Sequence, residues 1–314
     1  MLISFIIPVL DEQDSLIQLH DEIVQNVAPN SYEIIFIDDG STDGSLEVMR
    51  TLSKRDTAVK IVSFRRNFGK AAALQTGFDL AKGQVVFTMD ADLQDNPIDI
   101  PKFLKQLEDG YDLVSGWKKK RHDPLNKRIP SRFFNAITSM YFKVRLHDFN
   151  CGYKAYRQEV IKEVDLYGEL HRYIPVLANA KGYRIGEIEV QHRERKHGKS
   201  KYGFERYLRG FLDLLSVRMV TIFRSSPLYL FGSWGAFFVT AGGVLSLYLT
   251  IMKVFYNMPL SNRPLLFLGV LLILVGMQFF SIGLVSELIV SKMHRITMGN
   301  SISIKEKINI DEEV

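Results

Sequence analysis

The chain has 314 residues, of which 46% are hydrophobic and 24% charged, and its formal net charge is +5. This length accommodates one soluble domain of about 210 residues followed by a membrane segment. A single cysteine, Cys151, excludes a disulfide within the chain and suits a reducing compartment. No cysteine and histidine cluster has zinc-site spacing, and no nucleic-acid-binding module accompanies the basic charge, so we expect neither zinc nor nucleic acid as a partner.

Apolar segments that alternate with helical segments predict a parallel sheet of strand–helix–strand units. The predicted strands cover residues 2–9, 33–37, 60–64 and 85–89, and helices are predicted to begin near Leu10, with early acids, and to cover about 71–81. The fold class is therefore α/β.

A polar cluster follows each predicted strand, where ligands of parallel sheets bind. The fourth strand ends in Asp90-Ala91-Asp92. Two carboxylates at a strand end can clamp a divalent cation, because Mg²⁺ takes one or two carboxylates and completes its shell with water and substrate phosphates. An isolated Asp-x-Asp is more often a solvated loop. The neighbouring clusters favour a metal-diphosphate site here.

Four motifs carry a resemblance to a known family: Pro-Val-Leu-Asp-Glu at 8–12, Asp-Asp-Gly-Ser-Thr-Asp at 38–43, Arg-Asn-Phe-Gly-Lys at 66–70 and Asp-Ala-Asp-Leu-Gln-Asp at 90–95. In this order they resemble the family-two inverting glycosyltransferases over about residues 1–210. Within the family, the last motif is most similar to the polyisoprenyl-phosphate glycosyltransferases, such as the bactoprenol glucosyltransferases and dolichol-phosphate mannose synthase. The Gln-x-x-Arg-Trp motif of the processive polysaccharide synthases is absent from the sequence, which argues against a polymerase.

The resemblance implies a GT-A fold, which is Rossmann-like with a mainly parallel sheet, and a set of site residues. The donor, a nucleotide sugar, is expected to contact Pro8, Glu12, Asp39, Lys70, Asp90 and Ala91. Mg²⁺ or Mn²⁺ is expected on Asp90, Asp92 and Gln94. The acceptor phosphate is expected on Arg128, Ser131, Arg195 and Lys201. Asp92, Arg128 and Asp148 are the candidate catalytic residues.

Two long apolar stretches follow, and each is long enough to cross a hydrocarbon core of about 30 Å as a helix. We expect a transmembrane hairpin with spans at about 228–252 and 265–288. Because the chain begins in a core strand without a cleavable signal, we expect a cytoplasmic catalytic domain and both termini cytoplasmic, in a bacterial inner membrane. Basic residues flank the spans with a small positive-inside margin.

Basic segments at 118–132 and 193–209 lie between the metal motif and the first span. Such segments attract anionic lipid, and we assign residues 118–121 to that role. The pattern from 203 to 226 predicts an amphipathic helix, in the membrane interface or packed on its own domain. The expected domains are thus a GT-A domain at 1–202, this helix at 203–226, the hairpin at 227–292 and a cytoplasmic tail at 293–314.

The basic segments favour a lipid phosphate as acceptor. A phosphate monoester has its second pKa near 6, so it is a nucleophile at neutral pH without a general base. Our preferred reaction is inverting transfer of glucose from UDP-glucose to a polyisoprenyl phosphate such as undecaprenyl phosphate. Alternatives are another nucleotide sugar, a lipid hydroxyl acceptor that would require Asp148 as a base, or a nucleotide-sugar-binding membrane protein without catalysis. Whether the chain forms a homo-oligomer is left open.

Overall fold

The computed structural model describes residues 1–119, 138–139, 142, 144–166, 168, 170–193, 227–257 and 264–297. The described residues divide into two compact units, one within residues 1–193 and the other within residues 227–297. The predicted amphipathic helix at 203–226 and the end of the tail from residue 298 lie outside the described residues.

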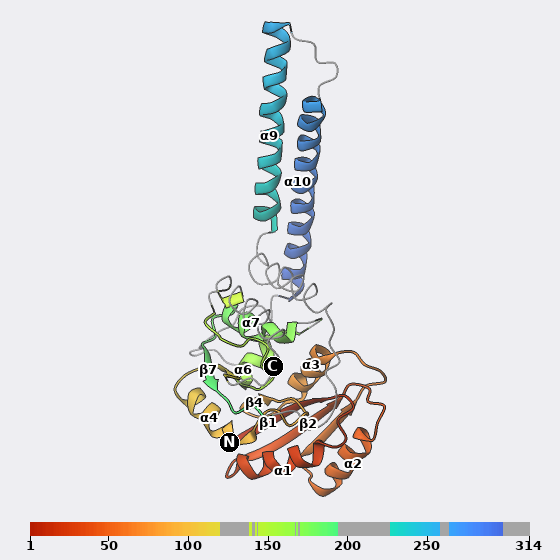
Figure 1. Ribbon diagram of the computed structural model, residues 1–314, viewed down its shortest axis with the longest axis vertical. Coiled ribbons are helices and arrows are strands. Elements are labelled where there is room, and N and C mark those ends of the chain that lie inside the picture. The colour runs from red at the N-terminus through yellow and green to blue at the C-terminus, as the bar shows by residue number, and fades with distance from the viewer. Residues whose placement is uncertain are drawn as a thin grey trace. The chain divides into compact units, whose positions relative to one another are not determined.

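The first unit is built on a seven-stranded sheet with the order β3-β2-β1-β4-β6-β5-β7 (Figure 1). The strands are β1 Leu2–Val9, β2 Ser31–Asp38, β3 Val59–Ser63, β4 Val85–Thr88, β5 Leu113–Trp117, β6 Lys154–Arg157 and β7 Ile185–Glu189. Only β6 runs antiparallel to its neighbours. The predicted mainly parallel α/β sheet is confirmed, and the four predicted strands match β1 to β4 within about two residues.

Helices cover both faces of the sheet, so the central strands are apolar on both faces. They are α1 Leu16–Val27, α2 Ser45–Arg55, α3 Lys70–Leu80, α4 Ile100–Glu108, α6 Gln158–Glu163 and α7 Ile174–Ala180, with short 3₁₀ turns η1 Pro97–Asp99 and η2 Leu170–Tyr173. The segment with early acids lies before α1, which begins only at Leu16 after Ser15. The predicted helix at 71–81 is α3, shifted by one residue.

Side chains from β1 alternate between two packed layers. Phe5 belongs to the core shared with α1, α2 and α4, and it stacks on Phe87 with ring centroids 5.3 Å apart. Ile6 points to the other face, against α3. A Cβ on Gly77 of that helix would lie 2.2 Å from an Ile6 methyl group, so glycine is what lets α3 approach β1 so closely.

The strand register brings the polar clusters to one edge of the sheet. Val9 is paired with Asp38, and Asp38 with Ser63, at the ends of β1, β2 and β3. Thr88 at the end of β4 is paired with Lys154, the first residue of the antiparallel β6. The segments that follow four parallel strands therefore meet the start of β6 at this edge.

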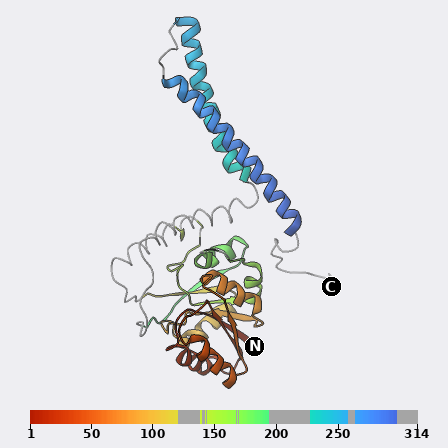
Figure 2. The same ribbon diagram turned by 90° about the vertical axis from the view of Figure 1, so that its right-hand side faces the viewer.

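The second unit contains two long helices, α9 Pro227–Tyr256 and α10 Pro264–Thr297, which lie side by side in both ribbon views (Figures 1 and 2). Their segments Pro227–Tyr256 and Pro264–Ile289 are long and apolar enough to cross a membrane. The predicted pair of apolar helices is confirmed. However, α10 continues to Thr297, so the first residues of the expected tail are helical.

Glycines allow the two helices to pack closely. A Cβ on Gly235 would lie 2.8 Å from the Gly276 carbonyl oxygen, and one on Gly242 would lie 2.6 Å from the Gly269 carbonyl oxygen. Small residues are typical of helix contacts in membranes, because apolar side chains gain little by leaving lipid. The two helices therefore pack through the close fit of their backbones at these glycines.

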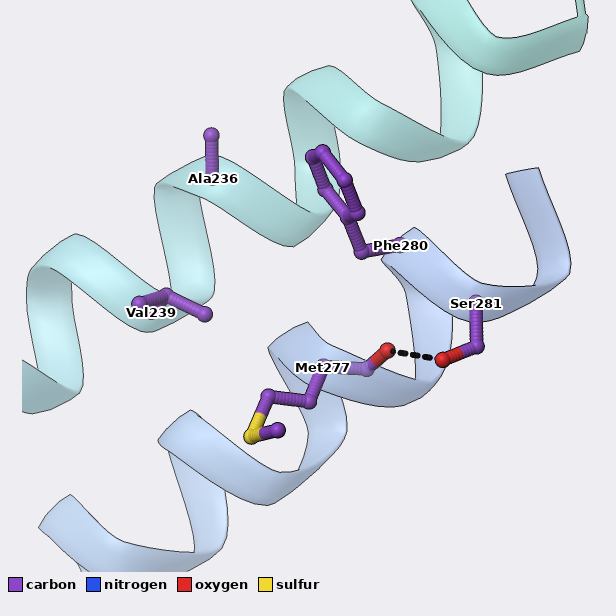
Figure 3. A pocket seen from close by; sticks show the side chains of 5 residues that line it. All are labelled: Ala236, Val239, Met277, Phe280 and Ser281. Carbon is purple, nitrogen blue, oxygen red and sulfur yellow. Dashed lines mark hydrogen bonds between the residues drawn. The ribbon is translucent and has the colours of Figure 1, made fainter. Parts of the chain in front are cut away.

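An open apolar groove of about 270 Å³ lies along this pair of helices (Figure 3). Its lining residues are Ala236 and Val239 of α9 with Met277, Phe280 and Ser281 of α10. The Ser281 hydroxyl donates a 3.0 Å hydrogen bond to the Met277 carbonyl of its own helix. The lining offers no charged group for phosphate or metal chemistry, so we place the candidate site at the sheet edge.

Candidate functional site

The loops after β1 and β2 are hydrogen-bonded to each other. The Asp11 carboxylate accepts from the Thr42 amide at 2.8 Å, and the Ser41 hydroxyl accepts from the Asp11 amide at 3.0 Å. The Glu12 amide donates to the Ser45 hydroxyl at 2.9 Å. Asp11 has a φ of 55°, a left-handed conformation that aspartate tolerates better than most residues. Pro8 and Glu12, the predicted donor contacts, are thus held at the sheet edge beside the second loop.

Asp39 holds the loop that follows β3. Its buried carboxylate accepts hydrogen bonds from the amides of Phe68, at 2.7 Å, and Gly69, at 3.0 Å. Burial raises the pKa of Asp39, and the two amide hydrogen bonds lower it only in part. Gly40 has a φ of 75°, and a Cβ there would lie 2.6 Å from the Arg66 backbone. Asp39 is thus bound to the amide of Gly69, the residue directly before Lys70, the next predicted donor residue.

The Asp-Ala-Asp motif follows β4 directly and is tied to α3. The ammonium group of Lys70, in the first turn of α3, forms an ion pair with the Asp90 carboxylate. Both side chains remain partly exposed, at 30% and 33%. Next in the loop, Asp92 accepts from the Gln94 amide at 3.2 Å, whereas Ala91 is buried. The structure therefore brings together the predicted donor and metal residues on this loop with Lys70.

The charges around Asp90 keep its carboxyl group ionised. Burial by itself would raise the pKa, but Lys70, then Lys118 and Lys154, outweigh burial and lower the pKa of Asp90 to about 2. The three lysines come from the start of α3, the residue after β5 and the start of β6. An ionised carboxylate at this position suits a cation ligand.

The prediction that Lys118 faces anionic lipid is wrong. We expected residues 118–121 to face anionic lipid, but the Lys118 side chain is only 11% exposed and its ammonium group lies 2.8 Å from the fully buried Asp95 carboxylate. Charge attraction to Asp95 outweighs burial and raises the pKa of Lys118 well above its usual value. Lys119, the next residue, is exposed and pairs with Glu189. The Lys119 amide donates to the Trp117 carbonyl oxygen at 3.0 Å, so the chain turns at Lys118 directly after β5.

The segment before β6 packs directly against Asp90. A Cβ on Gly152 would lie 2.6 Å from one Asp90 carboxylate oxygen, so no other residue fits without moving that carboxylate. Cys151 is buried, and burial raises the pKa of its thiol to about 12. Lys154 is also buried and donates to the Cys151 carbonyl oxygen, and burial lowers its pKa. Sequence reasoning missed Gly152 and Lys154, although both lie within the polar stretch 148–154.

Asp148 lies in the same stretch and is 2% exposed. Its carboxylate accepts a 3.1 Å hydrogen bond from the Asn150 amide, and its own amide donates to Glu187 at 3.1 Å. These contacts shape the turn that leads to Gly152. They are consistent with an orienting role for Asp148.

His171 in η2 is a further residue that the sequence did not single out. Burial first, then the charges of Lys70, Arg172 and Lys154, lower the pKa of His171 well below its usual value. Its buried Nδ1 has no hydrogen-bond partner among the described residues. The neutral imidazole of His171 therefore lies near enough to Lys70, Lys154 and Asp90 to interact with their charges.

The residues present fit a divalent cation. Among the described residues, no group of three or more histidine, cysteine or acidic side chains is arranged to hold a metal ion. Asp90, Asp92 and Gln94 nevertheless provide two carboxylates and a side-chain amide oxygen on one loop, and Mg²⁺ commonly uses one or two carboxylates with substrate phosphates as its other ligands. The residue types on this loop suit a metal held together with a diphosphate, and the assignment of the ligands stays a prediction.

Arg128, Ser131, Arg195 and Lys201, the predicted acceptor-phosphate residues, lie outside the described residues. Their assignment stays a prediction.

The family model described as "Glycosyl transferase family 2" matches residues 4–165. The chain belongs to that family. The matched segment begins in β1 and includes every strand-end cluster that carried the sequence resemblance.

Curated relatives extend the similarity over both units. A dodecaprenyl-phosphate galacturonate synthase of Rhizobium johnstonii is 38% identical over 300 residues, which cover 93% of this chain and 89% of that protein. An undecaprenyl-phosphate 4-deoxy-4-formamido-L-arabinose transferase of Pseudomonas paraeruginosa is 34% identical over 91% of this chain and 84% of its own. The predicted resemblance to the polyisoprenyl-phosphate members of the family is confirmed.

Solved structures support the fold. Glucosyl-3-phosphoglycerate synthase from Mycobacterium tuberculosis, in complex with Mn²⁺ and UDP-glucose, has a TM-score of 0.54 and 18% identity, with 70% of this chain and 78% of that chain covered. The same enzyme in complex with UDP has a TM-score of 0.53 and 19% identity, with coverage of 68% and 79%. The GT-A-like fold predicted from the motifs is confirmed.

Proposed function

We propose that this glycosyltransferase moves a sugar from a UDP-linked donor to a polyisoprenyl phosphate at the cytoplasmic face of a membrane. One observation carries the proposal: an ionised Asp90, paired with Lys70, lies two residues before Asp92 in the loop that follows β4. Carboxylates that hold a metal and a lysine that neutralises phosphate are what a diphosphate leaving group requires.

The donor residues divide by position. Pro8, Glu12 and Asp39 lie at the ends of β1 and β2 and would hold the nucleoside, whereas Lys70, Asp90 and Ala91 lie toward the diphosphate. Mg²⁺ or Mn²⁺ on Asp90, Asp92 and Gln94 would stabilise the charge that develops on the leaving diphosphate. The Lys70–Asp90 ion pair lets Lys70 turn to a donor phosphate when Asp90 takes a different partner.

The acceptor is proposed to attack without a general base. A polyisoprenyl phosphate is largely dianionic at neutral pH, since phosphate monoesters have a second pKa near 6. Arg128, Ser131, Arg195 and Lys201 would position it, because arginine forms forked, charged hydrogen bonds to phosphate. Asp148 is buried and its carboxylate holds the turn at Asn150, which favours an orienting role over proton removal.

The identity of the transferred sugar is the part of the proposed reaction that the site residues constrain least. Our sequence-based choice was glucose, but the two curated relatives described above are named for galacturonate and for 4-deoxy-4-formamido-L-arabinose. A donor panel therefore has to include UDP-glucose, UDP-galacturonate and UDP-4-deoxy-4-formamido-L-arabinose. We propose UDP as the common part, because the bound nucleotide in the structural relatives is UDP.

The two apolar helices are proposed to anchor the enzyme as a transmembrane hairpin, with both termini cytoplasmic. Basic residues flank both outer ends of the hairpin, but Lys253 and Arg263 at the connecting loop leave only a small positive-inside margin for this orientation. A polyisoprenyl acceptor is itself a membrane lipid, so an anchored enzyme and its acceptor share one surface.

Transfer assays test this proposal. Full-length protein in detergent is incubated with undecaprenyl phosphate, Mn²⁺ and each radiolabelled donor in turn. The expected product is extractable into organic solvent, labile to mild acid and dependent on the lipid phosphate. An acid-stable product would instead indicate a hydroxyl acceptor, and no product from any donor would contradict the proposed function.

A further inference from the structure

The loop that carries the proposed metal ligands is strained. Leu93 lies between Asp92 and Gln94 with a φ of 60°, in the left-handed region, and its side chain is 3% exposed. A bulky residue rarely adopts this conformation unless surrounding contacts impose it. Contacts that hold the loop therefore determine where Asp90 and Asp92 lie.

A second segment runs antiparallel beside this loop. Asp95 and His192 form an isolated β-bridge, and the Arg193 amide donates to the Gln94 carbonyl at 3.0 Å. The Asn96 amide group donates to the Gln191 side chain at 3.0 Å. Residues 191–193 thus hold the loop immediately after the Asp-Ala-Asp motif.

The Arg193 guanidinium links the loop to α1. One of its nitrogens donates to both carboxylate oxygens of Glu22, at 2.9 and 2.7 Å, and another donates to the Asn96 side-chain oxygen at 2.7 Å. That same Asn96 oxygen accepts from the Ile98 amide at the start of η1. Glu22 lies on a helix packed in the core, so Arg193 ties a strained loop to a rigid element.

We propose that Arg193 is a positioning residue that holds the Asp90–Gln94 loop in the geometry required for metal and diphosphate. The inference rests on the proposed function, in which Asp90 and Asp92 bind the metal and the donor. The fork geometry matters, since arginine can reach a carboxylate and an amide oxygen simultaneously, whereas a lysine ammonium is a single point.

Arg157 provides a matched control. Its guanidinium donates to the carbonyl oxygens of Tyr111, at 3.2 Å, and Leu107, at 2.6 Å. Its exposure is 40%, close to the 35% of Arg193. It is paired with Val85 at the start of β4, at the opposite edge of the sheet from the site.

Binding of UDP in the presence of Mn²⁺ is measured by calorimetry on the full-length protein in detergent, alongside thermal unfolding. We expect Arg193→Met to weaken UDP binding at least tenfold, and Arg193→Lys to recover thermal stability more than affinity. Arg157→Met is expected to lower the unfolding temperature similarly but to change affinity by less than twofold. Wild-type affinity in Arg193→Met, or an equal loss in Arg157→Met, would overturn the positioning role.

The same assay separates this inference from the proposed function. Asp92→Asn should abolish the Mn²⁺ dependence of UDP binding. If the wild type binds neither UDP nor Mn²⁺, or if Asp92→Asn binds both normally, the metal-diphosphate assignment itself fails. If Asp92→Asn behaves as expected and Arg193→Met binds normally, only the role of Arg193 fails.

Discussion

Gly152→Ala tests directly whether the position of Asp90 matters. The new Cβ would lie 2.6 Å from one Asp90 carboxylate oxygen, 2.8 Å from the other and 2.8 Å from the carboxyl carbon. An ordinary van der Waals contact begins at 3.4 Å, so the carboxylate must retreat by about 0.8 Å. A misplacement of about 1 Å in a reacting constellation can cost about 100-fold in rate. We therefore expect a loss of roughly that size in sugar transfer.

The assay compares Gly152→Ala with Gly186→Ala, both in full-length protein. A Cβ on Gly186 would contact the Tyr111 ring at 3.0 Å, which is a tight contact at the edge of the sheet away from the site. Overpacking of this kind typically costs 1–3 kcal/mol of stability. Both variants should therefore show a lowered unfolding temperature, but only Gly152→Ala should lose transfer and Mn²⁺-dependent UDP binding. Normal transfer by a folded Gly152→Ala variant would refute the reasoning.

Four further predictions follow from the same contacts. Asp90→Asn, and chelation of the wild type, should each reduce transfer at least 100-fold because the leaving diphosphate loses its counter-charge; full activity in excess chelator would exclude the metal. Cys151, the only cysteine, should react with iodoacetamide at pH 8 about 1,000-fold more slowly in the folded protein than in urea, since burial raises its pKa to about 12; equal rates would mean that the thiol is exposed. His171 is held neutral, so the unfolded chain binds a proton that the folded chain excludes below about pH 6.5. The contribution of His171 to the free energy of unfolding is thus fully present above that pH and decreases below it. Between pH 7.5 and 5.5, denaturant titration should show that His171→Asn loses up to about 1 kcal/mol less stability than the wild type. An unchanged pH profile in the variant would contradict this. Gly276→Leu, whose Cβ would lie 2.7 Å from the Gly235 carbonyl oxygen, should lower the unfolding temperature, whereas Gly243→Leu, with open space around it, should not; equal effects would count against the close helix contact.

The sequence by itself determined the class of fold and predicted a set of donor residues that the structure places at one end of the sheet. The spacing of apolar residues along a strand or an amphipathic helix indicates which of its faces is buried, so the elements of the sheet can be predicted from the sequence. Asp90 and Asp92 were predicted because ligands of parallel sheets bind where strands end, and Asp39 and Lys70 because their motifs resemble those of the family. The paired apolar helices were equally readable, since length and hydropathy alone set the requirement for crossing a membrane.

Only the tertiary structure decided which charged residues are buried and which neighbours they have. Lys118 and Lys119 are adjacent and chemically identical, yet one pairs with buried Asp95 and the other lies exposed on Glu189. Gly152 and Arg193 contact the segment from Asp90 to Asn96 although both lie far away in sequence, through pairing that no local pattern encodes. The physical reason is that strand order and register, set by packing of the whole sheet, determine which distant side chains share a low-dielectric space.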